Sequence, residues 1–437
     1  MKEEVRNRRM RHLKVLIEQN KESRYVGDII GNDSNDACFC YAKEYLSSKD
    51  SRAISISLPL GDEKFDAITT KNFFEGLLPE GFTRRCVAEW MHTSESNYLA
   101  LLLGLGQECL GAIRVIDNDS QEAEPEYRKL TDEDVKKLAK EGATESAELV
   151  TKSHLSLTGA SGKVGLFYDG KQWYLPIGNA PSTHIVKQSH IRLRRIVCNE
   201  LLCLLTAKKL GVDVVDSFIV NIGDFEDEDI LFATKRYDRK TDSKGRKING
   251  LNVPYRLHQE DFSQALKIPS EEKYEKNNEG YVKKVFELLR NYSFDPISDQ
   301  LKLWDLCVFN YLIGNTDNHI KNISLIYSED LKSIRMAPAY DIVSTIVYDN
   351  SSEDMAMSIG GKYNIFEITR NSFEIEARNI GLGSKMAMKR FDEMVMNFQE
   401  ALRMAADELI QNGLKGVEDI YENILDAYQK RLQTEVH

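Results

Sequence analysis

One short polar segment that directly follows an apolar helix constrains this chain more than any other feature of its sequence. Residues 301–313 predict a strong helix, and residues 314–322 continue the chain as GNTDNHIKN. Asn322 stands five positions after Asp317. Asp341 follows in an apolar Tyr-Asp-Ile-Val context, where an unpaired carboxylate would be costly. The fold therefore has to place these side chains at the edge of its core and to give the buried carboxylate a partner.

A carboxylate, an amide and a second carboxylate in this order fit the transfer of a phosphoryl group from ATP. Asp317 would be the base that orients an attacking hydroxyl, and Asn322 and Asp341 would hold Mg²⁺ against the phosphates. The catalytic loop of protein kinases uses the same five-residue step from Asp to Asn. Capping turns are the alternative, because Asn and Asp are common turn residues. His319, between the base and the metal ligand, is expected either to contact a phosphate or to be structural.

Length and composition limit the class of protein. A chain of 437 residues with 42% hydrophobic residues is long enough for two or three domains. Its net charge of −11 argues against a protein that wraps bare nucleic acid over a broad basic face. The seven cysteines lack a zinc spacing and are expected to be reduced thiols. We find no secretory signal and no apolar stretch of the roughly 20 residues that a membrane span needs, so a cytoplasmic protein without membrane contact is expected.

Changes in the residue pattern along the chain predict an α+β protein with two lobes, as in protein kinases, and an additional N-terminal α+β subdomain. Strands are expected at residues 13–17 and 54–58, the second because its apolar residues alternate. Residues 117–147, rich in Asp, Glu and Lys, are expected to form a surface linker. A loop with glycines, a strand that ends in lysine, a helix and further strands follow in the order of a kinase N-lobe. The expected parts are 1–125 for the subdomain, 150–255 for the N-lobe and 256–437 for a mainly helical C-lobe. The C-lobe carries residues 314–322, which we call the catalytic segment after their expected role.

The predicted N-lobe offers three further candidate contacts for a nucleotide. Lys187 ends a strand and should point inward, where the phosphates of ATP and Glu200 from the next helix would neutralise it; a lysine that reaches solvent is the alternative. Residues 158–163 read TGASGK and fail the Walker A spacing. They fit better as a flap whose backbone N–H groups approach phosphates, with a plain hairpin turn as the alternative. Residues 235–238 follow a strand, where a kinase hinge presents backbone groups to adenine.

Together these segments resemble the HipA family, the serine/threonine kinase toxins of bacterial type II toxin–antitoxin systems. The resemblance spans nearly the whole chain. An LHQED segment at 257–261 resembles a family signature of otherwise unclear chemistry. The other segments that carry the resemblance are NTDNHIKN at 315–322, APAYDI at 337–342, KRYDR at 235–239, SISLPL at 55–60 and FFEGLLP at 73–79.

The resemblance implies a two-lobed kinase-like fold, ATP and Mg²⁺ as cofactors, and a role for each matching residue. Asp317 is implied as the catalytic base, Asn322 and Asp341 as the metal ligands, and Ser156 as a serine that becomes autophosphorylated. The flap departs from the family, since Ser161 and Gly162 stand where a polar pair such as Gln-Glu is common. The implied nucleotide contacts are Thr158, Gly159, Ala160, Ser161, Gly162, Lys163, Lys187, Lys235, Arg236, Tyr237, Asp238, His319, Lys321, Asn322, Tyr340 and Asp341.

Partners and substrates come from the resemblance alone. It implies a small HipB-like helix-turn-helix antitoxin, contact with DNA only through that antitoxin, and a protein substrate in translation such as an aminoacyl-tRNA synthetase. Two alternatives stay open. The same metal residues could transfer AMP instead of phosphate, or the chain could be a nucleotide-binding co-regulator that acts mainly through a DNA-binding antitoxin. Asp317 argues against the co-regulator, because a pure binding module does not need a base.

Overall fold

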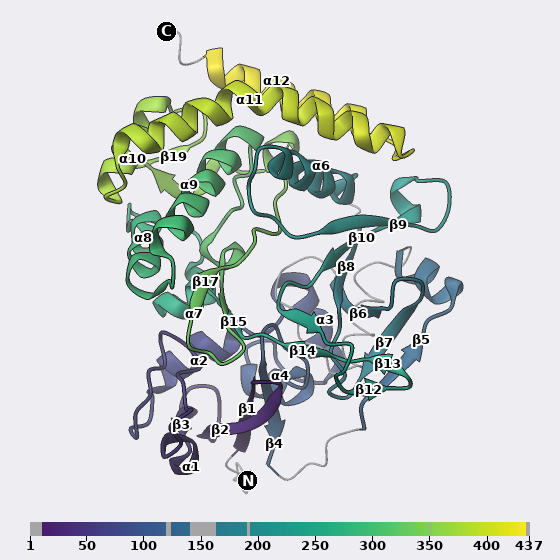
Figure 1. The fold of residues 1–437 in the computed structure, drawn as a ribbon, viewed down its shortest axis with the longest axis vertical. Helices are drawn as coiled ribbons and strands as arrows, with labels where there is room; N and C mark the ends of the chain where they lie inside the picture. Colours follow the sequence, from purple (N-terminus) through teal and green to yellow (C-terminus); the bar gives the residue numbers. More distant parts are fainter. Residues whose placement is uncertain (1–10, 119–123, 140–162, 190–192, 350, 434–437) are drawn as a thin grey trace, which may run out of the picture.

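The protein has three parts that pack around a shared apolar core. A computed structural model describes residues 11–118, 124–139, 163–189, 193–349 and 351–433. A small sheet with short helices, a second sheet with one long helix, and a helical lobe follow one another along the chain (Figure 1). The main cluster of buried apolar side chains draws on all three. This is the α+β architecture that the sequence predicts.

The N-terminal subdomain is an antiparallel sheet with four helices. Leu13, Val15 and Ile17 alternate along its first strand and are buried on one face, as a strand with a single buried face requires. The strand predicted at residues 13–17 is therefore confirmed. The strands, in the order β3-β2-β1-β4, are β1 (Arg11–Gln19), β2 (Glu22–Gly31), β3 (Cys38–Tyr41) and β4 (Ile113–Asp117), and the helices are α1 (Lys43–Leu46), α2 (Ala67–Glu75), α3 (Gly81–Trp90) and α4 (Tyr98–Leu105).

The strand predicted at residues 54–58 is wrong. The amide of Leu58 donates to the carbonyl of Ser55 at 3.2 Å, which closes a turn instead. The alternation has another cause, because the Ser55 hydroxyl and the Ile56 amide both donate to the buried carboxylate of Glu260. The polar groups of Ser55 and Ile56 therefore bind one distant side chain, and the segment forms no face of a sheet.

The N-lobe is a six-stranded antiparallel sheet with one long helix. In the helix α6 (Ile196–Lys209), Leu201, Leu202 and Leu204 are buried, and the helix packs against the sheet and against the C-lobe. The strands, in the order β5-β7-β6-β8-β10-β9, are β5 (Glu126–Lys129), β6 (Lys163–Tyr168), β7 (Trp173–Ile177), β8 (His184–Gln188), β9 (Ser217–Asn221) and β10 (Ile230–Lys235).

The surface linker predicted at residues 117–147 is wrong in part, because β5 lies within it. This strand pairs with β7 at the edge of the N-lobe sheet. Tyr127 is its inward side chain and packs on Phe167 with ring centroids 4.2 Å apart. One buried aromatic residue is enough for a short edge strand whose other side chains face water, so its low apolar content concealed it.

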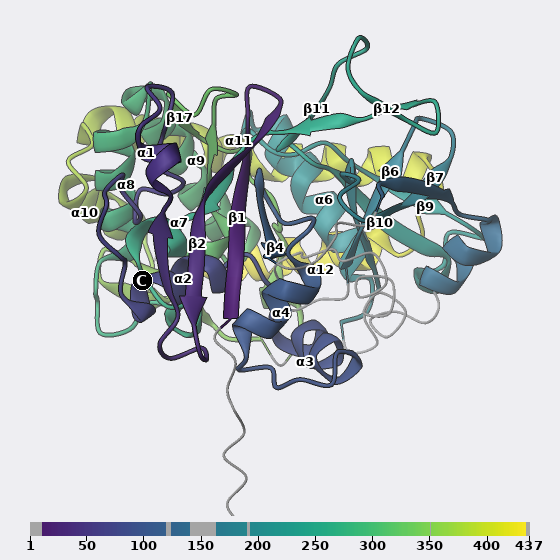
Figure 2. The same cartoon turned by 90° about the horizontal axis from the view of Figure 1, so that it is seen from below.

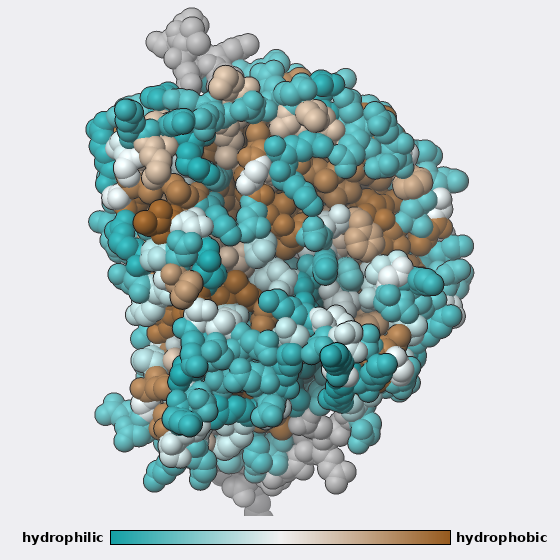
Figure 3. All heavy atoms as spheres, in the orientation of Figure 1, coloured by the Kyte–Doolittle hydropathy of each residue, from teal (hydrophilic) through white to brown (hydrophobic). Residues whose placement is uncertain are grey.

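The C-lobe is mainly helical, as predicted. Its last two helices lie at the end of the molecule away from the N-terminal subdomain (Figure 1). Figure 2 shows β1 and β2 in front of this lobe, with α11 and α12 at the back. The exposed atoms are mostly hydrophilic over the lower part of the face in Figure 3, and apolar atoms gather in its upper part. No helix within the described ranges has the length and apolar character needed to cross a membrane. The helices are α7 (Phe262–Leu266), α8 (Tyr281–Tyr292), α9 (Pro296–Ile313), α10 (Arg370–Asn379), α11 (Ser384–Gln411) and α12 (Val417–Gln433).

Short strands complete the fold between and within the lobes. β15, β16 and β17 form an antiparallel sheet next to the catalytic segment. The short strands are β11 (Arg239–Thr241), β12 (Lys247–Ile248), β13 (Leu251–Asn252), β14 (Pro254–Arg256), β15 (Gln259–Asp261), β16 (Ser324–Tyr327), β17 (Ile334–Met336), β18 (Asp354–Ile359) and β19 (Lys362–Asn364).

Helix α9 ends where the catalytic segment begins, and its sequence fixes both ends. The Asp295 carboxylate accepts from the Ser298 amide at 3.3 Å, and Pro296 opens the helix, where a missing N–H costs nothing. Gly314 ends it in the left-handed region with a φ of +77°. A Cβ at this position would lie 2.4 Å from Ile346, so glycine is required sterically as well.

Candidate active site

The catalytic segment after α9 is held in one conformation by its own amide side chains. The Asn315 side-chain amide donates to Oδ1 of Asn310 at 2.8 Å, and the backbone amide of Asp317 donates to Oδ1 of Asn315 at 3.1 Å. The Asn322 side-chain amide donates to the carbonyl oxygen of Asp317 at 3.1 Å. The five-residue step therefore folds Asn322 back onto Asp317, with the short helix η3 (Ile320–Asn322) between them.

The Asp317 carboxylate lies at a cavity and is exposed on one side. The cavity has a volume of about 750 Å³, and Tyr274, Thr316 and Met355 are among its lining residues. The Tyr274 hydroxyl donates to Oδ1 of Asp317 at 2.7 Å. The loss of hydration on the protein side raises the pKa of Asp317, and the nearby charge of Asp341 adds to the rise. A carboxylate of this kind has room for a further hydroxyl group beside it.

Lys187 joins the N-lobe to the second predicted metal ligand. From β8, its ammonium donates to both carboxylate oxygens of Glu200 on α6, at 2.7 and 2.9 Å, and to Oδ1 of Asp341 at 2.6 Å. The predicted inward direction and the pairing with Glu200 are confirmed. Burial alone would lower the pKa of Lys187, but the charges of Asp341 and Glu200 outweigh it and raise the pKa, so the lysine stays charged.

Asp341 has an unusual backbone conformation for a residue with a side chain. Its φ is +56°, in the left-handed region that non-glycine residues rarely adopt. Burial would raise the pKa of Asp341, but Lys187 and then Lys163 outweigh it and lower the pKa, so the carboxylate is ionised. The predicted partner for a carboxylate in apolar surroundings is thus present.

Lys163 adds a second buried positive charge to the site. It stands opposite Lys187 in the register of β6 and β8 and is nearly inaccessible to solvent. Burial lowers the pKa of Lys163, and the neighbouring Lys187 lowers it further, while Asp341 opposes this. Two adjacent lysines thus lie beside two carboxylates, those of Asp341 and Glu200, and ammonium groups of this kind are suited to binding phosphate oxygens. The other predicted flap positions, Thr158, Gly159, Ala160, Ser161 and Gly162, and the predicted autophosphorylated Ser156, lie outside the described residues.

Lys321 and His319 lie in the catalytic segment but differ in what they offer a ligand. The Lys321 ammonium is paired with Asp261 at 2.9 Å and with Glu80 at 3.3 Å, so two protein carboxylates already neutralise it. Burial lowers the pKa of His319 to about 3, so its ring is neutral. Its buried Nδ1 has no hydrogen-bond partner among the described residues. His319 therefore presents an unused polar atom, whereas Lys321 does not.

Residues of the predicted hinge make two kinds of contact, one through a side chain and one through the backbone. The Tyr237 ring stacks on Tyr340 with centroids 6.0 Å apart, and the Tyr340 hydroxyl bonds to Ser324 at 2.6 Å and to the carbonyl of Lys321 at 3.1 Å. This pair connects the N-lobe to the catalytic segment. The backbone amide of Lys235 donates to the carbonyl of Asp216 at 2.9 Å and is thus part of the strand connection.

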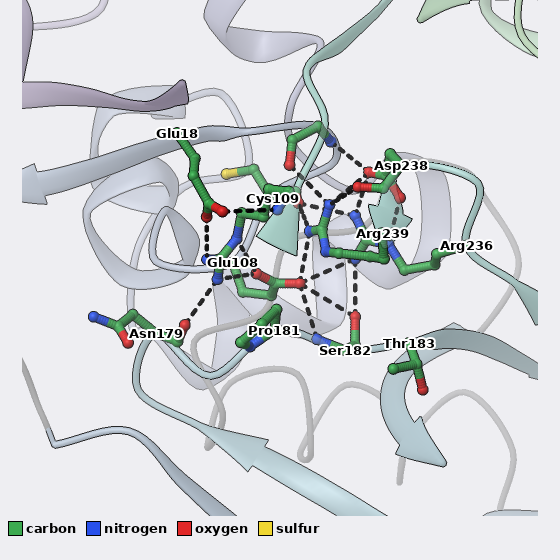
Figure 4. A network of polar contacts seen from close by, with 12 residues as sticks. Glu18, Glu108, Cys109, Asn179, Pro181, Ser182, Thr183, Arg236, Asp238 and Arg239 are labelled. Carbon is green, nitrogen blue, oxygen red and sulfur yellow. Dashed lines mark hydrogen bonds and ion pairs between the residues drawn. The ribbon is translucent and has the colours of Figure 1, made fainter. Parts of the chain in front are cut away.

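The side chains of Arg236 and Asp238 belong to a buried ionic network and not to an open nucleotide site. Figure 4 shows the Arg236 side chain between the carboxylates of Asp238 and Glu108, and Glu108 is fully buried. Three guanidinium groups, those of Arg236, Arg239 and Arg256, contact the Glu108 carboxylate at 3.2, 2.8 and 2.6 Å. Burial would raise the pKa of Glu108, but these charges lower it to about 2. The backbone amide of Arg236 donates to the carbonyl of Thr183 at 2.9 Å, and the contact of residues 235–238 with adenine stays a prediction.

Comparison with known proteins agrees with this geometry. The family model described as the HipA-like C-terminal domain matches residues 155–402, and the model described as the HipA N-terminal domain matches residues 17–116. The chain belongs to the HipA family. This membership confirms the resemblance and, with relatives named as kinases, the prediction of an enzyme of the kinase class.

Two relatives and one solved structure define the similarity to other HipA proteins. The chain is 32% identical to the putative kinase Y4mE of Sinorhizobium fredii, over 89% of this chain and 91% of that one. It is 28% identical to the serine/threonine-protein kinase toxin HipA of Shewanella oneidensis, over 82% of each chain. A solved complex of HipA, HipB and operator DNA from Shewanella oneidensis MR-1 matches with a TM-score of 0.77 at 23% identity, over 97% of this chain and 96% of that one. The two-lobed kinase-like fold of HipA is thereby confirmed.

The HipA signature at residues 257–261 connects the N-terminal subdomain to the catalytic segment. His258 Nε2 lies 2.7 Å from the carbonyl oxygen of Ile54. Glu260 accepts hydrogen bonds from the subdomain and from the Tyr327 hydroxyl. Asp261 pairs with Lys321 and also accepts from the Gln264 amide in the first turn of α7. The polar side chains of this signature have a structural role, because they are bonded to the N-terminal subdomain and to Lys321 of the catalytic segment.

The donor set of this HipA site fits a magnesium–nucleotide complex. The described residues contain no group of three His, Cys, Asp or Glu side chains that could hold a metal alone. Mg²⁺ bound with a nucleotide needs only one or two carboxylates, because phosphates and water fill its other positions. Asn322 and Asp341 would supply the oxygen ligands of the metal. The two buried lysines and the unused Nδ1 of His319 are suited to the phosphates.

Two residues of the HipA site escaped sequence reasoning. Tyr274 contacts the predicted base, and Glu80, which begins α3, pairs with both Lys321 and Lys273. Tyr274 lies in a loop rich in Glu, Lys and Asn that shows no periodicity. The only signal for Glu80 is its place after Pro79 in the FFEGLLP segment, which marks a turn and not a charge partner.

Proposed function

We propose that this chain is an ATP- and Mg²⁺-dependent protein serine/threonine kinase. The observation that carries the proposal is the contact between Lys187 and Asp341 beside a catalytic segment in which Asn322 is bonded to Asp317. This convergence brings a base, two oxygen ligands and a phosphate-binding cation into one site from three separate segments.

Each residue has a defined task in this proposal. Lys187 and Lys163 bind phosphate oxygens, and Asn322 and Asp341 hold Mg²⁺, which neutralises charge on the phosphates when bound. Asp317 accepts the proton of a serine or threonine hydroxyl while that oxygen bonds to the γ-phosphorus and the bond to ADP breaks. Backbone groups of residues 235–238 take the adenine. His319 Nδ1 contacts a phosphate or its bound water, while Lys321 supports the segment through its carboxylate partners.

We further propose that the chain acts in the cytoplasm as the toxin of a HipBA-like pair. The HipB and operator DNA in the solved Shewanella complex support a small DNA-binding antitoxin as the partner, with DNA contacted only through it. A component of translation, such as an aminoacyl-tRNA synthetase, is the proposed substrate. Autophosphorylation of Ser156 and the flap at residues 158–163 stay predictions, as does the division into residues 1–125, 150–255 and 256–437.

Labelled nucleotides provide the test. The purified chain is incubated with a bacterial lysate and ATP labelled at the γ- or the α-phosphate, next to an Asp317→Ala variant. Label from γ-ATP on serine or threonine, absent with the variant, is expected. Label from α-ATP would show AMP transfer instead. Nucleotide binding without either label would favour the co-regulator.

A further inference from the structure

Tyr274 is placed against the proposed base by contacts on several sides. Its hydroxyl donates to Oδ1 of Asp317 at 2.7 Å, and its ring meets the His319 ring edge to face at 5.2 Å. The Lys273 ammonium lies 5.4 Å from the centre of the same ring and is bonded to Glu80 at 2.8 Å. An aromatic ring held in this way has few rotamers available.

The loop that carries Tyr274 is anchored on both sides of this residue. Before it, the carbonyl of Glu272 accepts a hydrogen bond from the Tyr281 hydroxyl at 2.9 Å. After it, the Glu275 carboxylate accepts from the amides of Gly280 and Ser358, both at 2.7 Å. The position of the Tyr274 backbone is therefore set by α8 and β18, and β18 is also bonded to the catalytic segment, because the Ala356 amide donates to the carbonyl of Thr316 at 2.9 Å.

Contact with Tyr274 leaves the Asp317 side chain with one free oxygen. Hydrogen bonds from Asn315 and Asn322 fix the backbone of Asp317, so its remaining freedom is the rotation of its side chain. An ionised carboxylate only accepts hydrogen bonds, and Tyr274 occupies Oδ1. Burial and the Asp317 charge raise the pKa of Tyr274, so the phenol keeps its proton and remains a donor. Oδ2 is then the oxygen left for an acceptor hydroxyl that enters from the adjoining cavity.

We infer that Tyr274 is a positioning residue for the phosphoryl-transfer step, which holds one oxygen of Asp317 so that the other faces the acceptor hydroxyl. This inference rests on the proposed kinase function. Tyr274 takes no proton and touches no phosphate in this role. Orientation of a base is sensitive to small displacements, so loss of this contact should slow the chemical step and leave binding intact.

The Tyr274→Phe variant tests the inference, because it keeps the ring and removes only the hydroxyl. With saturating ATP and an identified protein acceptor, kcat is expected to fall about ten-fold or more, with the KM values for ATP and acceptor unchanged. Tyr174→Phe is the matched control, since it also removes a phenol that donates to an aspartate, Asp169 at 3.2 Å, but lies on β7 of the N-lobe sheet and not in the loop of Tyr274. Its kcat is expected to stay within about two-fold of the unmodified chain, in keeping with a lost bond away from the reacting atoms.

Three kinetic results would overturn the inference. These are an unchanged kcat in Tyr274→Phe, a loss that appears in KM and not in kcat, or an equal loss of kcat in Tyr174→Phe. Phosphate found on Tyr274 by mass spectrometry would also overturn it, because an esterified phenol cannot donate to Asp317. If the unmodified chain transfers no phosphate to any protein, the proposed function itself fails. An active chain with an unaffected Tyr274→Phe variant removes only the role of Tyr274.

Discussion

Asp317 and Asp341 carry the same carboxylate, but the structure gives them opposite electrostatic surroundings. Desolvation and the charge of the other aspartate raise the pKa of Asp317, whereas Lys187 and Lys163 lower the pKa of Asp341. A base works best when its pKa approaches the working pH, and a metal ligand must stay ionised. The proposed separation of Asp317 and Asp341 into base and metal ligand therefore rests on their neighbours and not on residue type.

Replacing Asp317 and replacing Asp341 should change the Kd for Mg-ATP by different amounts. Asp317→Ala is expected to abolish transfer and to leave the Kd for Mg-ATP within about two-fold, because Asp317 contacts neither metal nor phosphate in the proposed site. Asp341→Ala is expected to weaken Mg-ATP binding by at least about ten-fold, since it removes a metal ligand and a partner of Lys187. Calorimetric titration of both variants with Mg-ATP measures this. Equal affinities would contradict the assigned roles.

At the scale of elements, β15 connects two parts of the molecule through a buried carboxylate. Glu260 accepts from the Ser55 hydroxyl, the Ile56 amide and the Tyr327 hydroxyl, and Asp261 adds a charge next to it. Burial raises the pKa of Glu260 to about 7, and the hydrogen bonds limit that rise. The junction between the subdomain and the catalytic segment thus contains a group that titrates near neutral pH.

The raised pKa of Glu260 predicts that this junction weakens as pH rises. The folded pKa, about 7, lies above the ordinary value of 4.5, so the folded state binds the proton more tightly than the unfolded state. The resulting stability is fully present below about pH 4.5 and is lost as pH rises through about 7, at most about 3 kcal/mol. In urea unfolding from pH 5.5 to 8.5, the unmodified chain should lose stability relative to Glu260→Gln. Parallel pH profiles would show that Glu260 does not titrate in this range.

At the scale of the whole molecule, the network in Figure 4 joins the subdomain to the N-lobe and hinge. Glu108 lies just after α4, whereas the arginines that contact it follow β10 or end β14. Removing one member of a buried, balanced set of charges leaves the others without compensation. The network therefore specifies how the sheet of the subdomain meets the sheet of the N-lobe.

Glu108→Gln should destabilise the whole chain. We expect a loss of about 3–5 kcal/mol in the free energy of unfolding, because three buried guanidinium groups lose a shared carboxylate. Glu408→Gln is the matched control, since its ion pair with Lys209 is exposed and such pairs contribute at most about 1 kcal/mol. Urea denaturation followed by circular dichroism measures both variants. Similar midpoints for the two would contradict the role of the network.

The sequence by itself determined the features that depend on local pattern and spacing. The apolar periodicity of α9 with its terminal glycine, the five-residue step from Asp317 to Asn322, and the strand that points Lys187 inward were predicted, and the structure contains each. These features extend over a few residues, where backbone geometry decides which side chains can meet. The order of these patterns also predicted the two lobes, whereas the antitoxin partner and the substrate came only from the resemblance.

Only the tertiary structure decided which charges meet across the molecule. Tyr274 reaches Asp317 from 43 residues away and Glu260 reaches Ser55 across 205 residues, and no pattern within one segment indicates either contact. The same limit explains the wrong strand at residues 54–58 and the missed β5, because both depend on a partner that is distant in sequence. Buried polar groups need partners of matching geometry, and packing of the complete fold selects those partners.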